Sequence, residues 1–415
     1  MRILDGARRD RLVRALEQRG ANDLSAIEPA VRHIVNDVRR NGDRALRRYA
    51  ARWDGLDKNE AVRVPEAELW DAWQKTSPEL QDAIKQAAAN IRQFCEWQKP
   101  KEWRREIQHG VWVGQVVRAL ESMGCYVPGG RYPLPSTLLM TVTPALVAGV
   151  REIRVASPRP AQATLAAAAF LGVREFNRVG GAQAVAALAY GTESIPRVSK
   201  IVGPGNRYVT AAKKLVAFDC AIEFLAGPTE AVIVSQDGDP AFIASDLVAQ
   251  AEHDPDALCV FITNSVRLAK GVQKEVQRRA RTNLIALQSL TRNGAILLVD
   301  SLDQAVETAN RIAPEHLTLP GALAPAVQNA GSIFLNEFTP QSAGDYISGP
   351  NHVLPTGAMA RVHGGLSVLD YVHIISCQEV YRDGLEQIAP PAIVLAEAEG
   401  LHAHAESLRM RCANA

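Results

Sequence analysis

The sequence predicts an α/β fold with two successive doubly wound (Rossmann-like) parallel-sheet modules, an N-terminal helical segment and a helical C-terminal tail. Three observations lead to this prediction. Residues 1 to about 120 carry apolar stripes of helical period. Strand-like runs then alternate with alanine-rich helical runs as far as residue 338, which is typical of βαβ units around a parallel sheet. Residues 367–380 and 391–408 return to a mainly helical pattern with no clear strand after them.

In the N-terminal segment, the clearest stripe is formed by Val31, Ile34, Val35, Val38, Leu46 and Tyr49. Asn41-Gly42-Asp43 interrupts it and offers an N-cap for the next helix. A second helix is predicted over residues 78–97, and Lys99-Pro100-Lys101 marks a boundary. The tryptophans of this segment are interpreted as packing residues.

The two modules follow in order. The first has predicted strands at residues 152–156, 175–179, 200–202 and 222–224, with helices at 138–150, 161–171, 182–190 and 208–217. The second has predicted strands at residues 231–235, 258–263, 295–299 and 331–338, with helices at 240–253, 265–281 and 301–312. The helical tail is expected either to pack on a partner subunit or to cap its own domain.

Composition excludes several classes of protein. The chain of 415 residues is 47% hydrophobic and 22% charged with a net charge of +1, so neither nucleic acid nor an anionic membrane is an expected partner. The N-terminus is charged from its second residue, unlike a signal peptide, and no apolar run is long enough to cross a bilayer. Six scattered cysteines without C-x-x-C spacing indicate reduced thiols, and therefore a cytoplasmic protein.

The segment 342–352 has the composition of a site. Asp345 and His352 lie in it beside Gly344, Gly349 and Pro350, and it lacks the apolar periodicity of a helix or a strand. Glycine allows close approach to a ligand, and proline stiffens the turn. A surface loop with incidental polar residues explains this segment equally well.

Glycine-rich turns follow the strands of the first module. The dinucleotide fingerprint G-x-G-x-x-G and the P-loop are both absent. Turns do occur at residues 128–130, 180–183, 203–206 and 226–230. Because ligands bind at the carboxyl ends of parallel strands, these turns favour a phosphate-binding role, although tight βα turns need glycine in any case.

Histidine is scarce, so its neighbours are informative. Gln250 and His253 share a helix face, although such an isolated pair is more often a solvated helix end. The adjacent Glu315 and His316 can each accept a proton near neutral pH. With Asp345 and His404, the first pair would supply nitrogen and oxygen ligands for zinc or a similar divalent ion, but no compact metal-binding spacing supports this.

Longer motifs resemble one family, histidinol dehydrogenase. They are CYVPGGRYPLPST, VGGAQAVAALAYGTES, GPGNRYVTAAK, LAGPTEAVIV, ASDLVAQAEHDPDA, APEHLTL, NAGSIFLNEFTPQSAGDYISGPNHVLPT and LAEAEGLHAH. They occur in the family's order and, with the N-terminal DVRRNGDRALRRYAARWDG, cover nearly the whole chain.

The resemblance implies the four-electron oxidation of L-histidinol to L-histidine through histidinal, the last steps of histidine biosynthesis, with one Zn²⁺ per subunit and NAD. It implies that His316 takes the hydroxyl proton and that Glu315 activates the water that attacks the aldehyde. The implied zinc ligands are Gln250, His253, Asp345 and His404. The implied substrate contacts are these four with Thr229, His316, His352 and Glu399, and the implied NAD contacts are Tyr126, Gln183 and Asn206.

The resemblance implies a homodimer with shared active sites. It also implies a division of the chain into domains. We expect an N-terminal helical arm over residues 1–19, a main α/β domain over 20–125 and 230–367, an inserted α/β domain with the NAD-binding loops over 126–229, and a helical tail over 368–415 that reaches the partner subunit.

Two departures from the family's pattern leave alternatives open. Thr229 stands where many members have serine, and His373 stands where a lysine is expected. A related dehydrogenase of another small polar alcohol, such as a sulfonated propanediol, is therefore the runner-up. A non-catalytic metal- or nucleotide-binding protein is a third reading, which the intact Glu315-His316 pair argues against.

Overall fold

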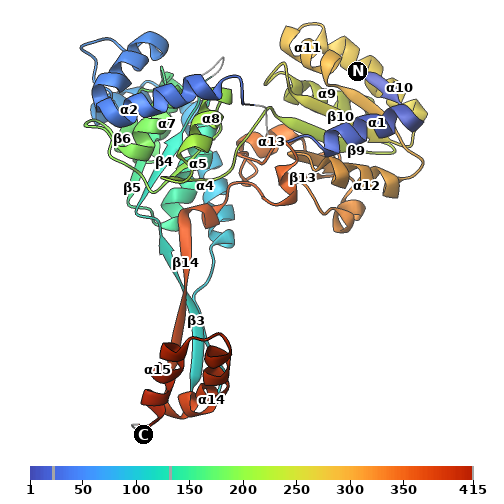
Figure 1. Ribbon diagram of the computed structural model, residues 1–415. Coiled ribbons are helices and arrows are strands. Elements are labelled where there is room, and N and C mark those ends of the chain that lie inside the picture. Colours follow the sequence, from blue (N-terminus) through green and yellow to red (C-terminus); the bar gives the residue numbers. More distant parts are fainter. Residues whose placement is uncertain (21–23, 130–132, 414–415) are drawn as a thin grey trace. The chain divides into compact units, whose positions relative to one another are not determined.

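The computed structural model describes residues 1–20, 24–129 and 133–413. It contains two compact units, one formed by Met1–Gln98 with Leu120–Tyr371 and the other by Lys99–Ala119 with Val372–Ala415. Figure 1 shows the elements of each unit. Gly130, in the first predicted glycine turn, lies outside the described residues.

The first unit contains a five-stranded parallel sheet in the order β6-β5-β4-β7-β8, here called the β4 sheet. Its strands are β4 (Ser122–Tyr126), β5 (Glu152–Ala156), β6 (Glu175–Asn177), β7 (Lys200–Val202) and β8 (Ala221–Ile222), and its helices are α5 (Pro135–Ala148), α6 (Gln162–Phe170), α7 (Gly181–Tyr190) and α8 (Arg207–Val216). The chain enters at the central β4, builds outward through β5 and β6, and then crosses to β7 and β8 on the other side. This reversal creates a crevice at the carboxyl ends of the strands.

A six-stranded parallel sheet, here called the β9 sheet, has the order β1-β11-β10-β9-β12-β13. Its strands are β1 (Arg2–Leu4), β9 (Glu230–Val234), β10 (Leu258–Thr263), β11 (Ala295–Leu298), β12 (His316–Leu319) and β13 (Ser332–Leu335). Its helices are α1 (Gly6–Glu17), α9 (Pro240–Ala251), α10 (Val266–Ala280), α11 (Leu284–Arg292) and α12 (Leu302–Ile312). All residues of β9 are buried, because helices cover both faces of a doubly wound sheet. The predicted fold class is thus confirmed.

The N-terminal helices are α2 (Glu28–Tyr49), a π-helical turn (Ala50–Asp54), α3 (Glu66–Gln74) and α4 (Pro78–Gln98). Gly42 kinks α2 with a φ of 50°, as the predicted interruption requires. These helices pack on α5, α6, α7 and α8. Residues 28–98 therefore lie with the β4 sheet, whereas the sequence-based division grouped residues 20–125 with 230–367. The domain boundaries themselves stay a prediction.

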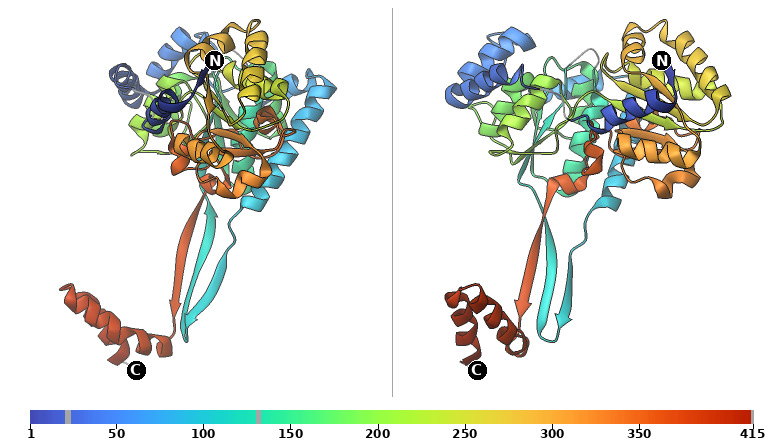
Figure 2. Two further views of the ribbon diagram at one scale, coloured as in Figure 1. Left: turned by 90° about the vertical axis from the view of Figure 1, so that its right-hand side faces the viewer. Right: turned by 45° about the vertical axis from the view of Figure 1, so that its right-hand side comes forward.

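The second unit contains an antiparallel sheet of β2 (Trp103–Gln108), β3 (Val111–Ala119) and β14 (Val372–Val380), followed by α14 (Arg382–Ala398) and α15 (His402–Ala413). Figure 2 shows β3 and β14 as neighbouring extended strands in both views. The prediction that residues 367–380 are mainly helical was wrong. Nine residues of β14 pair with β3, and β-branched Ile374, Ile375 and Val380 suit a strand. Most of β14 is exposed, so no buried face gave the alternating pattern of a strand.

Residues 1 to about 120 also contain strands where helix was predicted, namely β1, β2 and β3. β1 is too short to show a period and is held by parallel pairing with β11. The remaining elements are the short helix α13 (Gln341–Tyr346) and 3₁₀ turns at Gly321–Ala326, Met359–Arg361 and Val368–Tyr371. Within the described residues, no helix is long and apolar enough to cross a membrane.

Candidate active site

Most of the predicted catalytic, substrate and metal residues of the first unit lie at the amino edge of the β9 sheet. Thr229 immediately precedes β9, and Glu315 and His316 stand at the start of β12. Gln250 and His253 come from the end of α9, which runs antiparallel to the strands and so ends at their amino edge. Asp345 comes from α13. The sequence did not predict this edge, because ligands of open parallel sheets are expected at the carboxyl ends.

Glu315 is buried and held by two hydrogen bonds. Its Oε2 accepts from the Thr229 hydroxyl at 2.6 Å and from the Glu230 backbone N–H at 2.9 Å. The Thr229 Oγ1 also lies 3.3 Å from Oε1 of Gln250. A hydroxyl has one proton, so the shorter contact to Glu315 identifies the acceptor. Thr229 therefore orients the carboxylate of Glu315.

His316 is 3% exposed and stacks on Phe334 of β13, with ring centroids 5.7 Å apart. Its Nδ1 lies 3.3 Å from the Glu230 carbonyl oxygen, and its Nε2 lies 3.4 Å from Oδ1 of Asp345. Burial lowers the pKa of His316, but the carboxylates of Glu315 and Asp345 raise it, to about 10 on balance. A pKa this high keeps the imidazole protonated near neutral pH, with Nδ1 donating to the Glu230 carbonyl, so Nε2 must give up its proton before it can act as a base.

Glu230 connects this pair to the N-terminal arm. Its buried carboxylate accepts from Arg19 at 2.8 and 2.7 Å and from the Gly357 N–H at 3.0 Å. Its backbone contacts both Glu315 and His316. Glu230 was not assigned to the site from the sequence, although it lies in the motif LAGPTEAVIV and follows Thr229 directly.

Asp345 contacts Gln250 as well as His316. The Gln250 Nε2 donates to Oδ2 of Asp345 at 3.1 Å. Burial raises the pKa of Asp345, but His316, His352 and His253 together lower it more, so the net shift is downward. His253, one helical turn after Gln250, is exposed. Within the described residues, no cluster of three or more His, Cys, Asp or Glu side chains is arranged to hold a metal ion.

The predicted site also includes two residues of the C-terminal tail, which belong to the second unit. Glu399 caps the end of α14, and His404 lies on α15. Both are exposed. The first unit alone thus supplies an amide, an imidazole and a carboxylate from Gln250, His253 and Asp345, which match the nitrogen and oxygen donors that Zn²⁺ accepts.

The segment 342–352 begins inside helix α13, so the prediction that no helix explains it was wrong for its first residues. A Cβ at Gly344 would lie 2.5 Å from the Phe334 ring, so glycine brings this helix close to β13. His352 makes two hydrogen-bond contacts, from Nδ1 to the Asp345 carbonyl oxygen at 2.7 Å and from Nε2 to the Thr137 hydroxyl at 3.1 Å. Thr137 lies on α5 and was not predicted.

The three predicted NAD contacts line one cavity of about 940 Å³ at the carboxyl edge of the β4 sheet. Tyr126 ends β4, and its hydroxyl accepts from the Gly181 N–H at 3.0 Å. Gln183 of α7 donates to Oδ2 of Asp54 at 3.0 Å. The Asn206 Oδ1 caps α8 by accepting from the N–H groups of Tyr208 and Val209. Burial raises the pKa of Tyr126 to about 12, so its hydroxyl keeps its proton and can donate.

The lining of this cavity matches an anionic ligand with a flat ring. Arg52 and Arg159 supply positive charge, whereas Arg48 is already paired with Asp37, and the N-termini of α7 and α8 begin there. Arg159 has a φ of 45°, a conformation rare outside glycine that concentrates at ligand sites. Tyr49 and Trp53 stack with centroids 5.0 Å apart. Helix N-termini and arginines can bind an anion without a glycine fingerprint.

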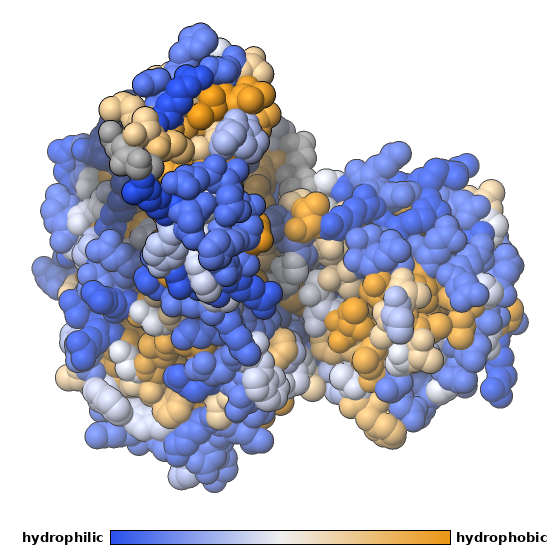
Figure 3. Space-filling model, turned by 90° about the horizontal axis from the view of Figure 1, so that it is seen from below, coloured by the Kyte–Doolittle hydropathy of each residue, from blue (hydrophilic) through white to orange (hydrophobic). Residues whose placement is uncertain are grey.

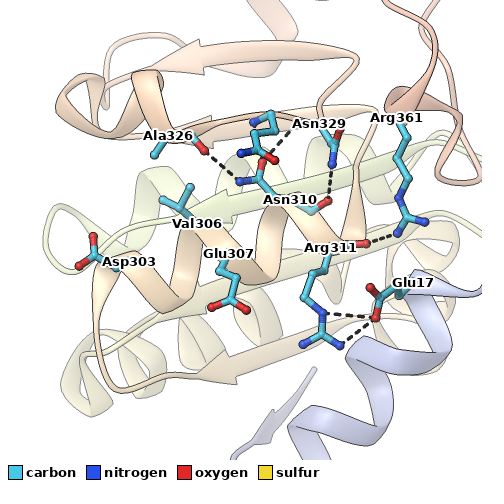
Figure 4. Close-up of a pocket in the computed structure, with 10 residues that line it drawn as sticks. Glu17, Asp303, Val306, Glu307, Asn310, Arg311, Ala326, Asn329 and Arg361 are labelled. Carbon is cyan, nitrogen blue, oxygen red and sulfur yellow. Dashed lines mark hydrogen bonds and ion pairs between the residues drawn. The ribbon is translucent and has the colours of Figure 1, made fainter.

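A second cavity of about 680 Å³ connects the two regions, because Asn206 and Glu230 both line it. A third, of about 430 Å³, lies beside α12 and carries charges that already pair (Figure 4). There Arg311 binds Glu17 at 2.8 Å, and Arg361 donates to the Arg311 carbonyl at 2.6 Å.

Comparison with known proteins identifies the family. The sequence model described as histidinol dehydrogenase matches residues 17–412. The chain belongs to the histidinol dehydrogenase family. It is 45% identical to the histidinol dehydrogenase of Methanothermobacter thermautotrophicus, over 97% of each chain, and 46% identical to that of Rhizobium meliloti, over 94% of this chain and 92% of the relative.

A solved structure extends this likeness to the fold. The crystal structure of histidinol dehydrogenase from Elizabethkingia anophelis is similar with a TM-score of 0.94 and 34% identity, and it covers 100% of this chain and 98% of that chain. The chain is therefore an oxidoreductase of the histidinol dehydrogenase family, as the motifs predicted.

Proposed function

We propose that this chain catalyses the zinc- and NAD-dependent oxidation of L-histidinol to L-histidine through histidinal, in histidine biosynthesis in the cytoplasm. The observation that carries the proposal is the buried Glu315-His316 pair, in which the His316 imidazole lies against the Asp345 carboxylate and Asp345 in turn accepts from Gln250. A binding protein has no need of such a pair, because keeping two proton acceptors buried is unfavourable without a chemical role.

His316 acts first. Once Nε2 has lost its own proton, it takes the alcohol proton as the carbon gives up a hydride to NAD, since Nδ1 is turned to the Glu230 carbonyl. Glu315 acts next, and its carboxylate removes a proton from the water that adds to the aldehyde carbon. The two oxidation steps together reduce two NAD and add one water oxygen to the product.

The metal would be held by Gln250, His253 and Asp345 of one subunit and His404 of the other. When bound, Zn²⁺ supplies positive charge that fixes the amine and imidazole of the substrate. Thr229, His352 and Glu399 would complete the substrate contacts. NAD would occupy the cavity lined by Tyr126, Gln183 and Asn206.

A homodimer with shared active sites is part of this proposal. Exposed apolar side chains on α14 and α15, such as Leu395 at 67% and Met410 at 57%, support a partner for the second unit. On the side of the molecule seen in Figure 3, hydrophobic patches interrupt a mostly hydrophilic surface.

The test is the stoichiometry of the reaction. Purified protein with zinc should form two NADH for each histidinol consumed and release histidine. One NADH with release of histidinal, or no turnover of histidinol, contradicts the proposal. Turnover of a sulfonated propanediol alone would favour the runner-up. His404→Asn should lower the bound zinc per subunit, and an unchanged zinc content would remove His404 from the metal site.

A further inference from the structure

Asp54 is a buried carboxylate at the proposed NAD cavity that the mechanism does not use. It ends the π-helical turn Ala50–Asp54, is 7% exposed and lines the cavity of about 940 Å³. Gly55 follows with a φ of 70°, so the chain turns sharply away after it. Single π-helical turns of this kind occur frequently at functional sites.

One oxygen of Asp54 is already occupied. Oδ2 accepts from the Gly180 N–H and from Nε2 of Gln183, both at 3.0 Å. These two bonds hold the turn that opens α7 and orient Gln183, one of the proposed NAD contacts. Sequence reasoning missed Asp54, although the quoted motif ARWDG contains it.

The other oxygen, Oδ1, accepts no hydrogen bond from any residue that the structure describes. Asp54 lines the cavity and Oδ1 is not sealed from it, so a donor on a ligand in the cavity can reach this oxygen. A ligand group beside Oδ1 that donates hydrogen bonds suits this carboxylate, whereas an anion would be repelled by it. The phosphates of a dinucleotide are anions, and the cavity offers them Arg52, Arg159 and the helix N-termini instead.

We propose that Asp54 accepts hydrogen bonds from the ribose hydroxyls of the bound dinucleotide and excludes a ribose carrying an additional phosphate, so that the cavity selects NAD over NADP. This inference rests on the proposed use of the cavity for NAD. In fingerprint-containing folds an acidic residue contacts the ribose 2′-hydroxyl from a position in the sheet. Here the carboxylate comes from the N-terminal helices that pack on the β4 sheet.

Binding measured without turnover tests the inference. ADP-ribose, its 2′-phosphorylated form and its 2′-deoxy form are titrated into the full-length protein by calorimetry. The wild type should bind ADP-ribose roughly 10- to 100-fold more tightly than the 2′-phosphorylated form. It should also bind ADP-ribose more tightly than the 2′-deoxy form, which lacks the hydroxyl, and these two comparisons give two affinity ratios. Asp54→Asn keeps the side-chain size and an acceptor for Gly180 and Gln183, and should bring both ratios close to one.

Asp57→Asn is the matched control. Asp57 carries the same charge as Asp54, but it is exposed and lies outside the cavity lining. Asp57→Asn should therefore leave both affinity ratios as they are in the wild type. Full retention of the preference in Asp54→Asn overturns the inference while the NAD proposal stands. Equal binding of the two ribose forms by the wild type also overturns it, even if Asp54→Asn does not fold. Failure of the wild type to bind any of the three removes the proposed NAD cavity itself.

Discussion

Thr229 shows how a single hydroxyl organises the proposed catalytic pair. It donates to Glu315 at 2.6 Å from the turn that opens β9. Thr229→Val keeps the shape and removes the donor, so we expect about a 10-fold or larger fall in kcat for histidine formation, with zinc content unchanged. Thr229→Ser keeps the hydroxyl and is expected to remain close to the wild type. Equal activity of the two variants in steady-state assays would show that the hydroxyl has no such role.

Glu315 and His316 are expected to divide the two oxidation steps. Glu315→Gln keeps the size of the side chain and removes the proton acceptor for water. We expect the variant to reduce NAD with histidinol in a single turnover at close to the wild-type rate, and to oxidise added histidinal at least about 100-fold more slowly. Stopped-flow NADH absorbance measures both steps. A similar loss in the two half-reactions would contradict the division.

At the scale of elements, the packing of α13 against β13 places Asp345. In Gly344→Ala, the added Cβ would lie 2.5 Å from the Phe334 ring, which in turn stacks on His316. We expect a loss of about 1–3 kcal/mol in the free energy of unfolding from overpacking, together with lower zinc content and activity.

Gly364→Ala is the matched control for this variant, because nothing lies within 4 Å of a Cβ there. Denaturant unfolding and metal analysis of the two variants give the comparison. A Gly344→Ala protein as stable and as rich in zinc as Gly364→Ala would show that the contact does not position Asp345.

The elements also show what the sequence could predict. β10 was predicted at its observed bounds and β9 within one residue, because a strand buried on both faces leaves a continuous apolar run. β14 was missed because its pairing with β3 depends on residues far away in the sequence. Glu315, His316 and Asp345 were named from family motifs. Their meeting at the amino edge of the sheet depends on the direction of α9 and on α13, which no local pattern contains.

At the scale of the whole molecule, mixed dimers test whether two chains share a site. Glu315→Gln has an intact tail and a defective catalytic pair. His404→Asn has a defective tail and an intact catalytic pair. If the tail completes the partner's site, co-expression of the two variants should restore histidine formation in some of the mixed dimers. Each variant alone should stay inactive. No recovery in mixed dimers, verified by two affinity tags, would mean that each chain completes its own site.

The antiparallel pairing of β3 with β14 has a consequence for synthesis of the protein. The two strands are separated by more than half of the chain, so β3 leaves the ribosome roughly 10 to 50 s before its partner strand is made. During that time one side of β3 presents unpaired backbone N–H and C=O groups, which can pair with other chains. A ribosome that stops before β14 would release a chain with this edge uncovered. Premature termination late in the message should therefore give aggregation, even though both parallel sheets are already complete.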